Sequence, residues 1–184
     1  MASKTIGVFM GAHDGENPNF KKAALEVGAA LAQYHYNLVY GGSATGLMGT
    51  VARSAKANGV YVTGIHPDNL IPEQAGPELS DNYIQVTDMS VRKDLMFKSA
   101  DAYLFMPGGL GTLEELSQVL SWTKLGIYNK PLVLLNLDGY YTSLAQWIEH
   151  SALEGFESFT DINQYALVND VASAFEHFAK KFDL

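Results

Sequence analysis

Short apolar runs alternate with segments of helical periodicity along almost the whole chain, and this alternation limits the possible folds more than any other feature. Strands are predicted over residues 5–10, 37–40, 60–65, 83–86, 102–106, 131–137 and 166–168. Helices are predicted from the Asn17-Pro18 pair onward, over 47–57, 89–99, 140–150 and 170–181, and over the segment of Leu113, Leu116, Val119 and Leu120. Apolar strands separated by helices are typical of a parallel sheet covered on both faces. The sequence therefore predicts an α/β fold, a Rossmann-like three-layer sandwich with a mainly parallel sheet, in one domain of residues 1–184.

The composition narrows the classes of function. Twelve Lys and Arg residues stand against 20 Asp and Glu, a net charge of −8, whereas a large nucleic-acid footprint normally needs a basic face. The chain has no cysteine, which excludes disulfides, thiolate metal ligands and a cysteine nucleophile. No segment has the length of a membrane span, and Gly7 and Gly11 break the first apolar run. We expect a cytoplasmic protein without nucleic-acid or membrane partners.

Three glycine-rich loops follow predicted strands, at residues 11–15, 41–49 and 108–111. In a Rossmann-like sheet such loops gather at the carboxyl edge, where ligands bind. One glycine loop alone is more simply an ordinary turn, but three at one edge favour a nucleotide or sugar-phosphate pocket. None has the Gly-x-Gly-x-x-Gly spacing of a dinucleotide site or the Lys-Ser/Thr ending of a nucleoside-triphosphate loop. NAD binding and ATP hydrolysis are therefore disfavoured.

The third loop carries the most information. Its sequence, Pro107-Gly108-Gly109-Leu110-Gly111-Thr112-Leu113-Glu114-Glu115, places three glycines where a buried strand turns into an amphipathic helix. There the backbone can approach a ligand closely, and the first helical N–H groups are free to bind an anion. We expect both carboxylates in the first helical turn. An anion cradle beside an acid indicates chemistry on a phosphorylated substrate.

Arg92 and Glu115 are the candidates for that chemistry, and each has a structural alternative. The planar fork of Arg92 suits phosphate or carboxylate, although adjacent Arg and Lys side chains often lie on a solvated helix face. Thr112-x-x-Glu115 has the spacing of a capping box, in which Glu reaches back to the helix start. The histidines show no metal-ligand spacing, so no metal site is expected, and His13 stands out because it lies in the first glycine loop.

Together these motifs resemble the LONELY GUY family of cytokinin-activating phosphoribohydrolases, often mislabelled lysine decarboxylases. The third loop matches the family's Pro-Gly-Gly-x-Gly-Thr-x-x-Glu signature, residues 89–93 match its Met-x-x-Arg-Lys element, and residues 39–49 resemble its second glycine loop. The likeness runs from the first strand to about His150.

The resemblance implies a single nucleoside-monophosphate-binding domain that hydrolyses an N-glycosidic bond. A purine nucleoside 5′-monophosphate, of cytokinin type or AMP, would yield free base and ribose 5-phosphate without a metal or organic cofactor. By position, Arg92 and Glu115 would be the family's essential Arg and Glu. The implied substrate-binding residues are Gly41, Gly42, Gly46, Met48, Met89, Lys93, Gly108, Gly109, Gly111 and Thr112. The family's dimers, with active sites at the subunit interface, imply a homodimer.

Such hydrolysis builds positive charge on the ribose, as in glycoside cleavage. A carboxylate near the anomeric carbon, the expected role of Glu115, would stabilise that charge and orient or deprotonate water. Arg92 would either grip the phosphate or stabilise charge on the departing base, and the sequence leaves both open.

Three positions depart from the family pattern. Met10-Gly11-Ala12-His13 replaces the usual Cys-Gly-Ser-Ser and removes two hydroxyls, Ser43 replaces a glycine, and His66 precedes Pro67 where an apolar residue is usual. We expect these changes to affect substrate preference rather than the chemistry.

Two other functions remain open. A non-catalytic nucleotide or molybdenum-cofactor carrier of this fold would keep a glycine-rich phosphate site; the altered first loop favours it, whereas retention of both Arg92 and Glu115 counts against it. A pyridoxal-phosphate decarboxylase would need a Schiff-base lysine, and no lysine in the sequence has a convincing setting for one.

Overall fold

The computed structural model describes residues 3–68 and 74–183. Its strands are β1 (Thr5–Phe9), β2 (Asn37–Tyr40), β3 (Val62–Pro67), β4 (Asn82–Val86), β5 (Ala102–Phe105), β6 (Leu132–Leu135) and β7 (Ala166–Val168). Its helices are α1 (Pro18–Gln33), α2 (Gly46–Ala57), α3 (Met89–Ser99), α4 (Leu110–Lys124), α5 (Thr142–Leu153), α6 (Phe159–Ile162) and α7 (Val171–Lys181), with 3₁₀ turns η2 (Pro77–Leu79) and η3 (Leu137–Gly139).

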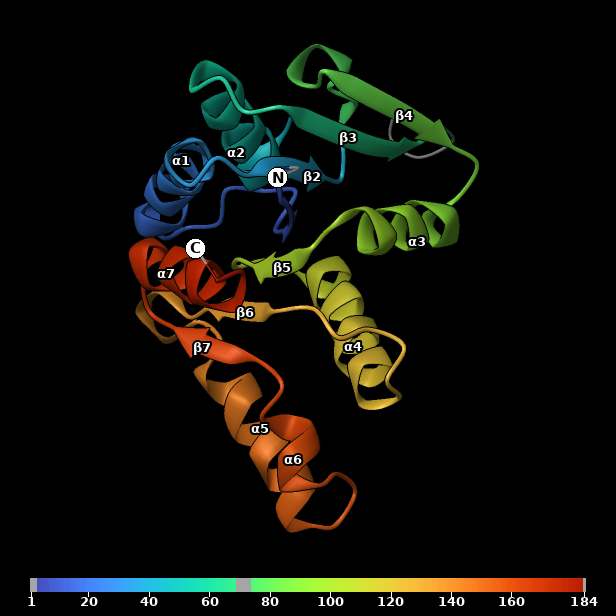
Figure 1. Ribbon diagram of the computed structural model, residues 1–184, viewed down its shortest axis with the longest axis vertical. Coiled ribbons are helices and arrows are strands. Elements are labelled where there is room, and N and C mark those ends of the chain that lie inside the picture. Colours follow the sequence, from blue (N-terminus) through green and yellow to red (C-terminus); the bar gives the residue numbers. More distant parts are fainter. Residues whose placement is uncertain (1–2, 69–73, 184) are drawn as a thin grey trace.

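The seven strands form one sheet in the order β4-β3-β2-β1-β5-β6-β7, and every pairing is parallel (Figure 1). Strands β2, β3 and β4 follow one another on one side of β1. The chain then crosses to the other side of β1, where β5, β6 and β7 follow in order to the opposite edge. The order therefore reverses between β1 and β5, and ligands of such sheets bind outside the carboxyl ends of the strands at this point. The predicted fold class is confirmed.

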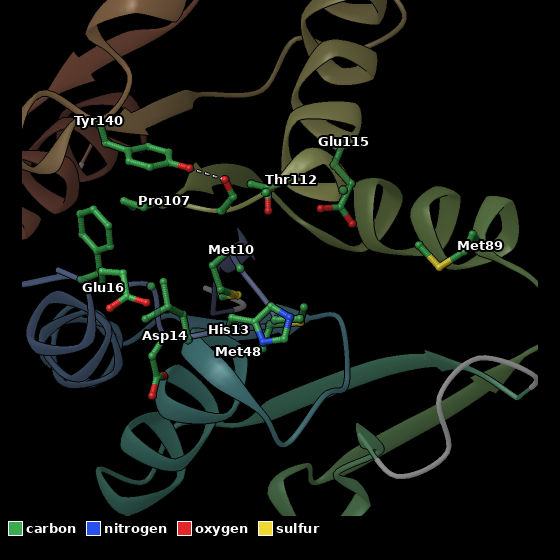
Figure 2. Close-up of a pocket in the computed structure, with 18 of the residues that line it drawn as sticks. Met10, His13, Asp14, Glu16, Met48, Met89, Pro107, Thr112, Glu115 and Tyr140 are labelled. Carbon is green, nitrogen blue, oxygen red and sulfur yellow. Dashed lines mark hydrogen bonds between the residues drawn. The ribbon is translucent and has the colours of Figure 1, made fainter. Parts of the chain in front are cut away.

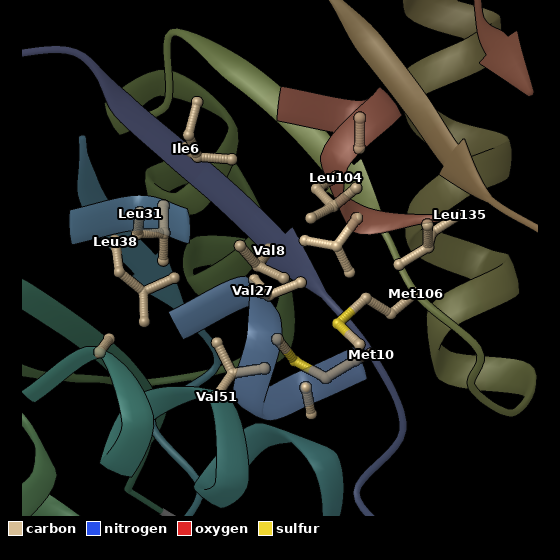
Figure 3. Close-up of a cluster of buried hydrophobic side chains, with 14 of the residues drawn as sticks. Ile6, Val8, Met10, Val27, Leu31, Leu38, Val51, Leu104, Met106 and Leu135 are labelled. Carbon is tan, nitrogen blue, oxygen red and sulfur yellow. The ribbon is translucent and has the colours of Figure 1, made fainter. Parts of the chain in front are cut away.

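Helices cover both faces of the sheet, each over its own apolar cluster. Ile6 and Val8 point toward α1, α2 and α7, where they pack with residues such as Val27 (Figure 3). Phe9 points to the opposite face, where α3 and α4 contribute Phe97 and other side chains. This alternation along one strand is the physical reason for the continuous apolar runs, because both faces of each central strand are buried.

Several predicted boundaries were wrong by a few residues. The third strand begins at Val62 rather than at position 60, because the N–H of Val60 bonds the carbonyl of Ala55 and closes the end of α2. β6 covers only Leu132–Leu135 of the strand predicted over 131–137, since Leu137 begins a 3₁₀ turn. The helix predicted over 140–150 runs instead from Thr142 to Leu153. Within the described part of the chain, no helix is both long enough and apolar enough to cross a membrane.

Candidate active site

A cavity of about 520 Å³ opens at the carboxyl ends of β1 and β5, where the strand order reverses. The loop after β1, the start of α2, one side of α3, the β5–α4 junction and the segment before α5 all contribute to its wall (Figure 2). The lining residues are Met10, Gly11, Ala12, His13, Asp14, Gly15, Glu16, Phe20, Leu47, Met48, Met89, Arg92, Pro107, Gly108, Gly109, Gly111, Thr112, Glu115 and Tyr140. The three glycine-rich segments thus meet at one edge of the sheet, as predicted.

Most of the predicted site residues lie in this lining, and four do not. Those that line the cavity are Met48, Met89, Arg92, Gly108, Gly109, Gly111, Thr112 and Glu115. Gly41, Gly42, Gly46 and Lys93 lie outside the lining. The functional role of each of these residues stays a prediction.

A buried ion pair joins α3 to α4 in the cavity wall. Nη1 of Arg92 donates to Oε1 of Glu115 at 3.3 Å, and both side chains are less than a tenth exposed. Nε of Arg92 also donates to the carbonyl oxygen of Ile65 at the end of β3 (3.2 Å). The sulfur of Met89 lies 3.7 Å from Nη1 as a third, weaker acceptor. Arg92 is therefore buried and held by three partners rather than lying on a solvated helix face, which rules out its structural alternative.

Glu115 is unusually basic for a carboxylate. Burial raises its pKa to about 7, and the positive charge of Arg92 opposes this rise without cancelling it. A carboxylate with a pKa near neutrality can both accept and donate a proton at physiological pH. Strong perturbation by burial and a specific charge partner, inside a cavity, is typical of functional carboxylates.

The predicted capping box is absent from the described start of α4. The helix begins at Leu110 with Gly109 as its N-cap, so Thr112 occupies the third helical position and cannot cap. The expectation that Glu114 and Glu115 lie in the first turn was also wrong, since that turn carries no acidic residue. The helix extends backward into the glycine loop, and Glu115 is consequently free to pair with Arg92.

The start of α4 lines the cavity and offers a cradle of backbone N–H groups. Its N-cap makes no side-chain hydrogen bond, and the first N–H groups of a helix have no intrahelical acceptor. A Cβ added at Gly109 or Gly111 would meet no atom within 4 Å, so these glycines leave open space. At Gly108, by contrast, a Cβ would lie 2.1 Å from Oγ1 of Thr112, so only glycine fits. Such an N-terminus is suited to binding a phosphate.

The glycines of the second loop lie outside the cavity lining but allow residues of the lining to approach the loop closely. A Cβ at Gly41 would lie 1.8 Å from Nη2 of Arg92, so the missing side chain makes room for the guanidinium. A Cβ at Gly46 would lie 2.3 Å from the carbonyl carbon of Ala12, which places the start of α2 directly against the first loop. Lys93 lies outside the cavity lining and pairs with Glu114.

Two of the positions that depart from the family pattern lie in different environments. His13 is exposed and projects into the cavity near Met48 (Figure 2). His66 is buried at the end of β3 outside the cavity lining; burial and the charge of Arg92 lower its pKa. His13 therefore lines the cavity, whereas His66 packs against Gly42, where an added Cβ would lie 3.0 Å from the Cβ of His66.

The sequence prediction missed Phe20 and Tyr140. Phe20 comes from the first turns of α1, and Tyr140 follows β6; their rings meet edge to face at 5.4 Å. The position of Tyr140 could have been predicted from the strand order, because the loop that follows β6 begins at the same sheet edge as the three glycine loops. In the ranges 3–68 and 74–183, no three His, Asp or Glu side chains form a candidate metal cluster.

Comparison with known proteins gives consistent matches. A family model described as "Possible lysine decarboxylase" matches residues 48–178. The chain is 41% identical over 167 residues to the probable cytokinin riboside 5'-monophosphate phosphoribohydrolase LOG4 of Oryza sativa subsp. japonica, covering 91% of this chain and 73% of that protein. It is also 41% identical over 173 residues to the cytokinin riboside 5'-monophosphate phosphoribohydrolase of Rhodococcoides fascians, covering 93% of this chain and 87% of the relative.

Solved structures share the fold at lower identity. The Moco carrier protein of Chlamydomonas reinhardtii superposes with a TM-score of 0.77 at 22% identity, with 99% of each chain covered. The molybdenum cofactor binding protein of Rippkaea orientalis has a TM-score of 0.72 at 24% identity, covering 100% of this chain and 97% of the other. At such identities the likeness shows the fold alone.

Proposed function

Because the chain belongs to the LONELY GUY family, we propose that it is a nucleoside 5′-monophosphate phosphoribohydrolase. It hydrolyses the N-glycosidic bond of a purine nucleotide, either AMP or a cytokinin-type adenine nucleotide, and releases the free base and ribose 5-phosphate. The observation that carries the proposal is the placement of the Arg92–Glu115 pair and the N-terminus of α4 in one cavity wall.

The cradle at the start of α4 binds the 5′-phosphate in this proposal. The N–H groups near Gly109 and Gly111 supply hydrogen-bond donors, and the helix dipole favours the negative charge. Glu115 lies on the same helix, one turn from Gly111, so a phosphate held there places the ribose within reach of its carboxylate. Binding energy from the phosphate then fixes the reacting carbon for attack.

In the chemical step, the C1′–N bond breaks and its electron pair leaves with the base. The ionised carboxylate of Glu115 stabilises the positive charge that develops on the ribose. A water molecule forms the new C1′–O bond and gives its proton to Glu115, which returns it to the base nitrogen. A carboxyl pKa near 7 suits both halves of this transfer.

Arg92 orients the carboxylate of Glu115 through the hydrogen bond between them. Two further roles remain alternatives, a direct grip on the phosphate and stabilisation of charge on the departing base. Nη2 faces the space beside Gly41, and it is available for either role if the guanidinium shifts on binding.

The Glu115→Gln substitution tests the assignment. It keeps the size of the side chain and a hydrogen-bond acceptor for Arg92 but removes the negative charge and the proton acceptor. We expect nucleotide binding, measured by calorimetry with AMP, to persist while turnover falls about 100-fold or more. Glu114→Gln is the matched control, because Glu114 is exposed and lies outside the cavity lining. Wild-type turnover in Glu115→Gln would show that the role is wrongly assigned.

We also propose that the chain works as a homodimer through the exposed apolar surface of α4 and α5. A groove of about 490 Å³ between these helices is lined by apolar side chains that include Leu113 and Trp147. Trp147 and the nearby Phe156 are 64% and 79% exposed, which is unusual for large apolar residues. Leu113 lies on the helix that carries Glu115, so a second copy bound here would adjoin the active site.

A cytoplasmic location and the lack of nucleic-acid or membrane partners stay predictions from the composition.

The alternative functions receive less support. The molybdenum-cofactor carriers share the fold at 22–24% identity, whereas the phosphoribohydrolases match at 41% over most of the chain. Decarboxylation through a Schiff base needs a lysine at the reacting centre, and the cavity lining in the described part of the chain includes none. Neither alternative accounts for the buried Arg92–Glu115 pair.

A further inference from the structure

Tyr140 lies at the edge of the cavity and has no part in the chemistry proposed above. Its side chain is partly exposed, and its hydroxyl group donates a hydrogen bond to the carbonyl oxygen of Gly108 at 2.5 Å (Figure 2). Gly108 is the first glycine of the anion cradle, and it lies 32 positions away in the sequence. The bond therefore connects the segment before α5 to the loop before α4.

The geometry of a peptide group makes this contact relevant to phosphate binding. The carbonyl of Gly108 and the N–H of Gly109 belong to the same planar group and point in opposite directions when it is trans. Fixing the carbonyl against Tyr140 therefore also fixes the direction of the Gly109 N–H. Within the described residues this N–H has no protein acceptor, and Gly109 lines the cavity. It is thus free to donate to a bound anion.

Tyr140 is itself held in place from α1. Two residues before it, Asp138 adopts a left-handed conformation (φ 51°), which is uncommon for a residue other than glycine and persists where the surroundings fix it. The Oδ2 atom of Asp138 accepts hydrogen bonds from the side chains of Asn17 and Asn19, both at 2.8 Å. The ring of Tyr140 then packs edge to face on Phe20.

We propose that Tyr140 is a positioning residue for the substrate phosphate. It acts through Gly108, by aiming the Gly109 N–H into the cradle, and makes no contact with the reacting atoms. The role rests on the proposed function, because it requires a phosphate at the start of α4. It predicts an effect on phosphorylated ligands and none on ligands that lack the phosphate.

The Tyr140→Phe substitution tests the role, since it removes only the hydroxyl group and keeps the ring on Phe20. We expect calorimetry to show the Kd of ribose 5-phosphate rising about three- to tenfold, the range for loss of one hydrogen bond. The Kd of adenine should be unchanged. With AMP as substrate, KM should rise by a similar factor and kcat should stay within about twofold, as expected when binding is weakened equally in ground and transition states.

Tyr103→Phe is the matched control. The hydroxyl of Tyr103 also donates to a backbone carbonyl, that of Phe97, but it is buried outside the cavity lining. This variant should lose stability and keep the wild-type Kd for ribose 5-phosphate.

Three results would overturn the positioning role. If the wild type binds ribose 5-phosphate and Tyr140→Phe binds it equally well, Tyr140 does not position the cradle, and the proposed function is untouched. If the Kd of adenine rises as much as that of ribose 5-phosphate, the hydroxyl group only maintains the general structure. If the wild type binds neither ribose 5-phosphate nor AMP, the phosphate cradle and the proposed function fail together.

Discussion

Arg92 and Glu115 meet inside the cavity wall at 3.3 Å, although 23 positions separate them in the sequence. Neither side chain reaches bulk water freely, and the pair ties α3 to α4 at the edge where β1 and β5 end. A buried ion pair is weak evidence of stabilisation, because the desolvation of both charges opposes their attraction. Its position beside the anion cradle supports the catalytic role proposed for it.

The fit of Arg92 against Gly41 predicts that Gly41→Ala disables the enzyme. The added methyl group would overlap Nη2 of Arg92, so the guanidinium must move and its contact with Glu115 is lost. We expect kcat/KM for AMP to fall about 100-fold, the cost of a displacement near 1 Å at a reacting centre. Wild-type kcat/KM in this variant, with its folding checked by circular dichroism, would show that the Arg92–Glu115 geometry is not needed.

Gly111→Ala should separate stability from function. Position 111 lies within α4, where alanine is favoured over glycine by up to about 1 kcal/mol, and the methyl group would meet no protein atom within 4 Å. We therefore expect the free energy of unfolding in urea to stay the same or rise, while KM for AMP increases because the methyl group occupies ligand space. An unchanged KM would mean that the phosphate does not approach Gly111.

The raised pKa of Glu115 predicts a pH-dependent stability difference between the wild type and Glu115→Gln. The folded wild type binds more protons than the unfolded chain between the ordinary carboxyl pKa of 4.5 and about 7, so it loses stability as the pH rises through this window. At about 1.4 kcal/mol per pKa unit, the full loss is roughly 3 kcal/mol. The variant lacks this titration, so its stability relative to the wild type should rise between pH 5 and pH 8. Parallel urea-unfolding curves across this range would contradict the assigned pKa.

The exposed apolar groove predicts that Trp147→Asp yields a monomer. A charge at this position cannot be buried against a second copy without a large desolvation cost. Analytical ultracentrifugation should show a dimer for the wild type and a monomer for the variant, and Tyr61→Asp is the control because Tyr61 is similarly exposed but lies outside the groove. A wild-type monomer, or a dimeric Trp147→Asp, would place the interface elsewhere or exclude it.

The fold was largely predictable because it depends on periodicity. Both faces of the central strands are buried, so a strand such as β2 was predicted at its observed boundaries from its run of apolar residues. Where apolar residues continue beyond the end of a strand, the predicted strand boundary was less accurate. After β6, the apolar Leu137 follows a single polar residue, Asn136, and the sequence does not show that the backbone has already turned there.

The site was predictable where a motif carries it and not where tertiary contacts do. The glycine loops indicated the cradle, but the capping-box spacing of Thr112 and Glu115 gave a local explanation that the structure excludes. Helix starts depend on which glycine takes the cap, and spacing alone does not decide this. The contact between Tyr140 and Gly108 joins distant segments, so no local pattern could have indicated it.

The most direct measurement is incubation of the purified protein with a panel of nucleoside 5′-monophosphates, including AMP and isopentenyladenosine monophosphate, followed by chromatographic separation of the products. The matching nucleosides, which lack the phosphate, serve as controls. Free base and ribose 5-phosphate should form in equal amounts from at least one purine monophosphate and not from its nucleoside. No release of base from any monophosphate, by protein that still binds nucleotide, would contradict the proposed hydrolysis and indicate a carrier built on the same fold.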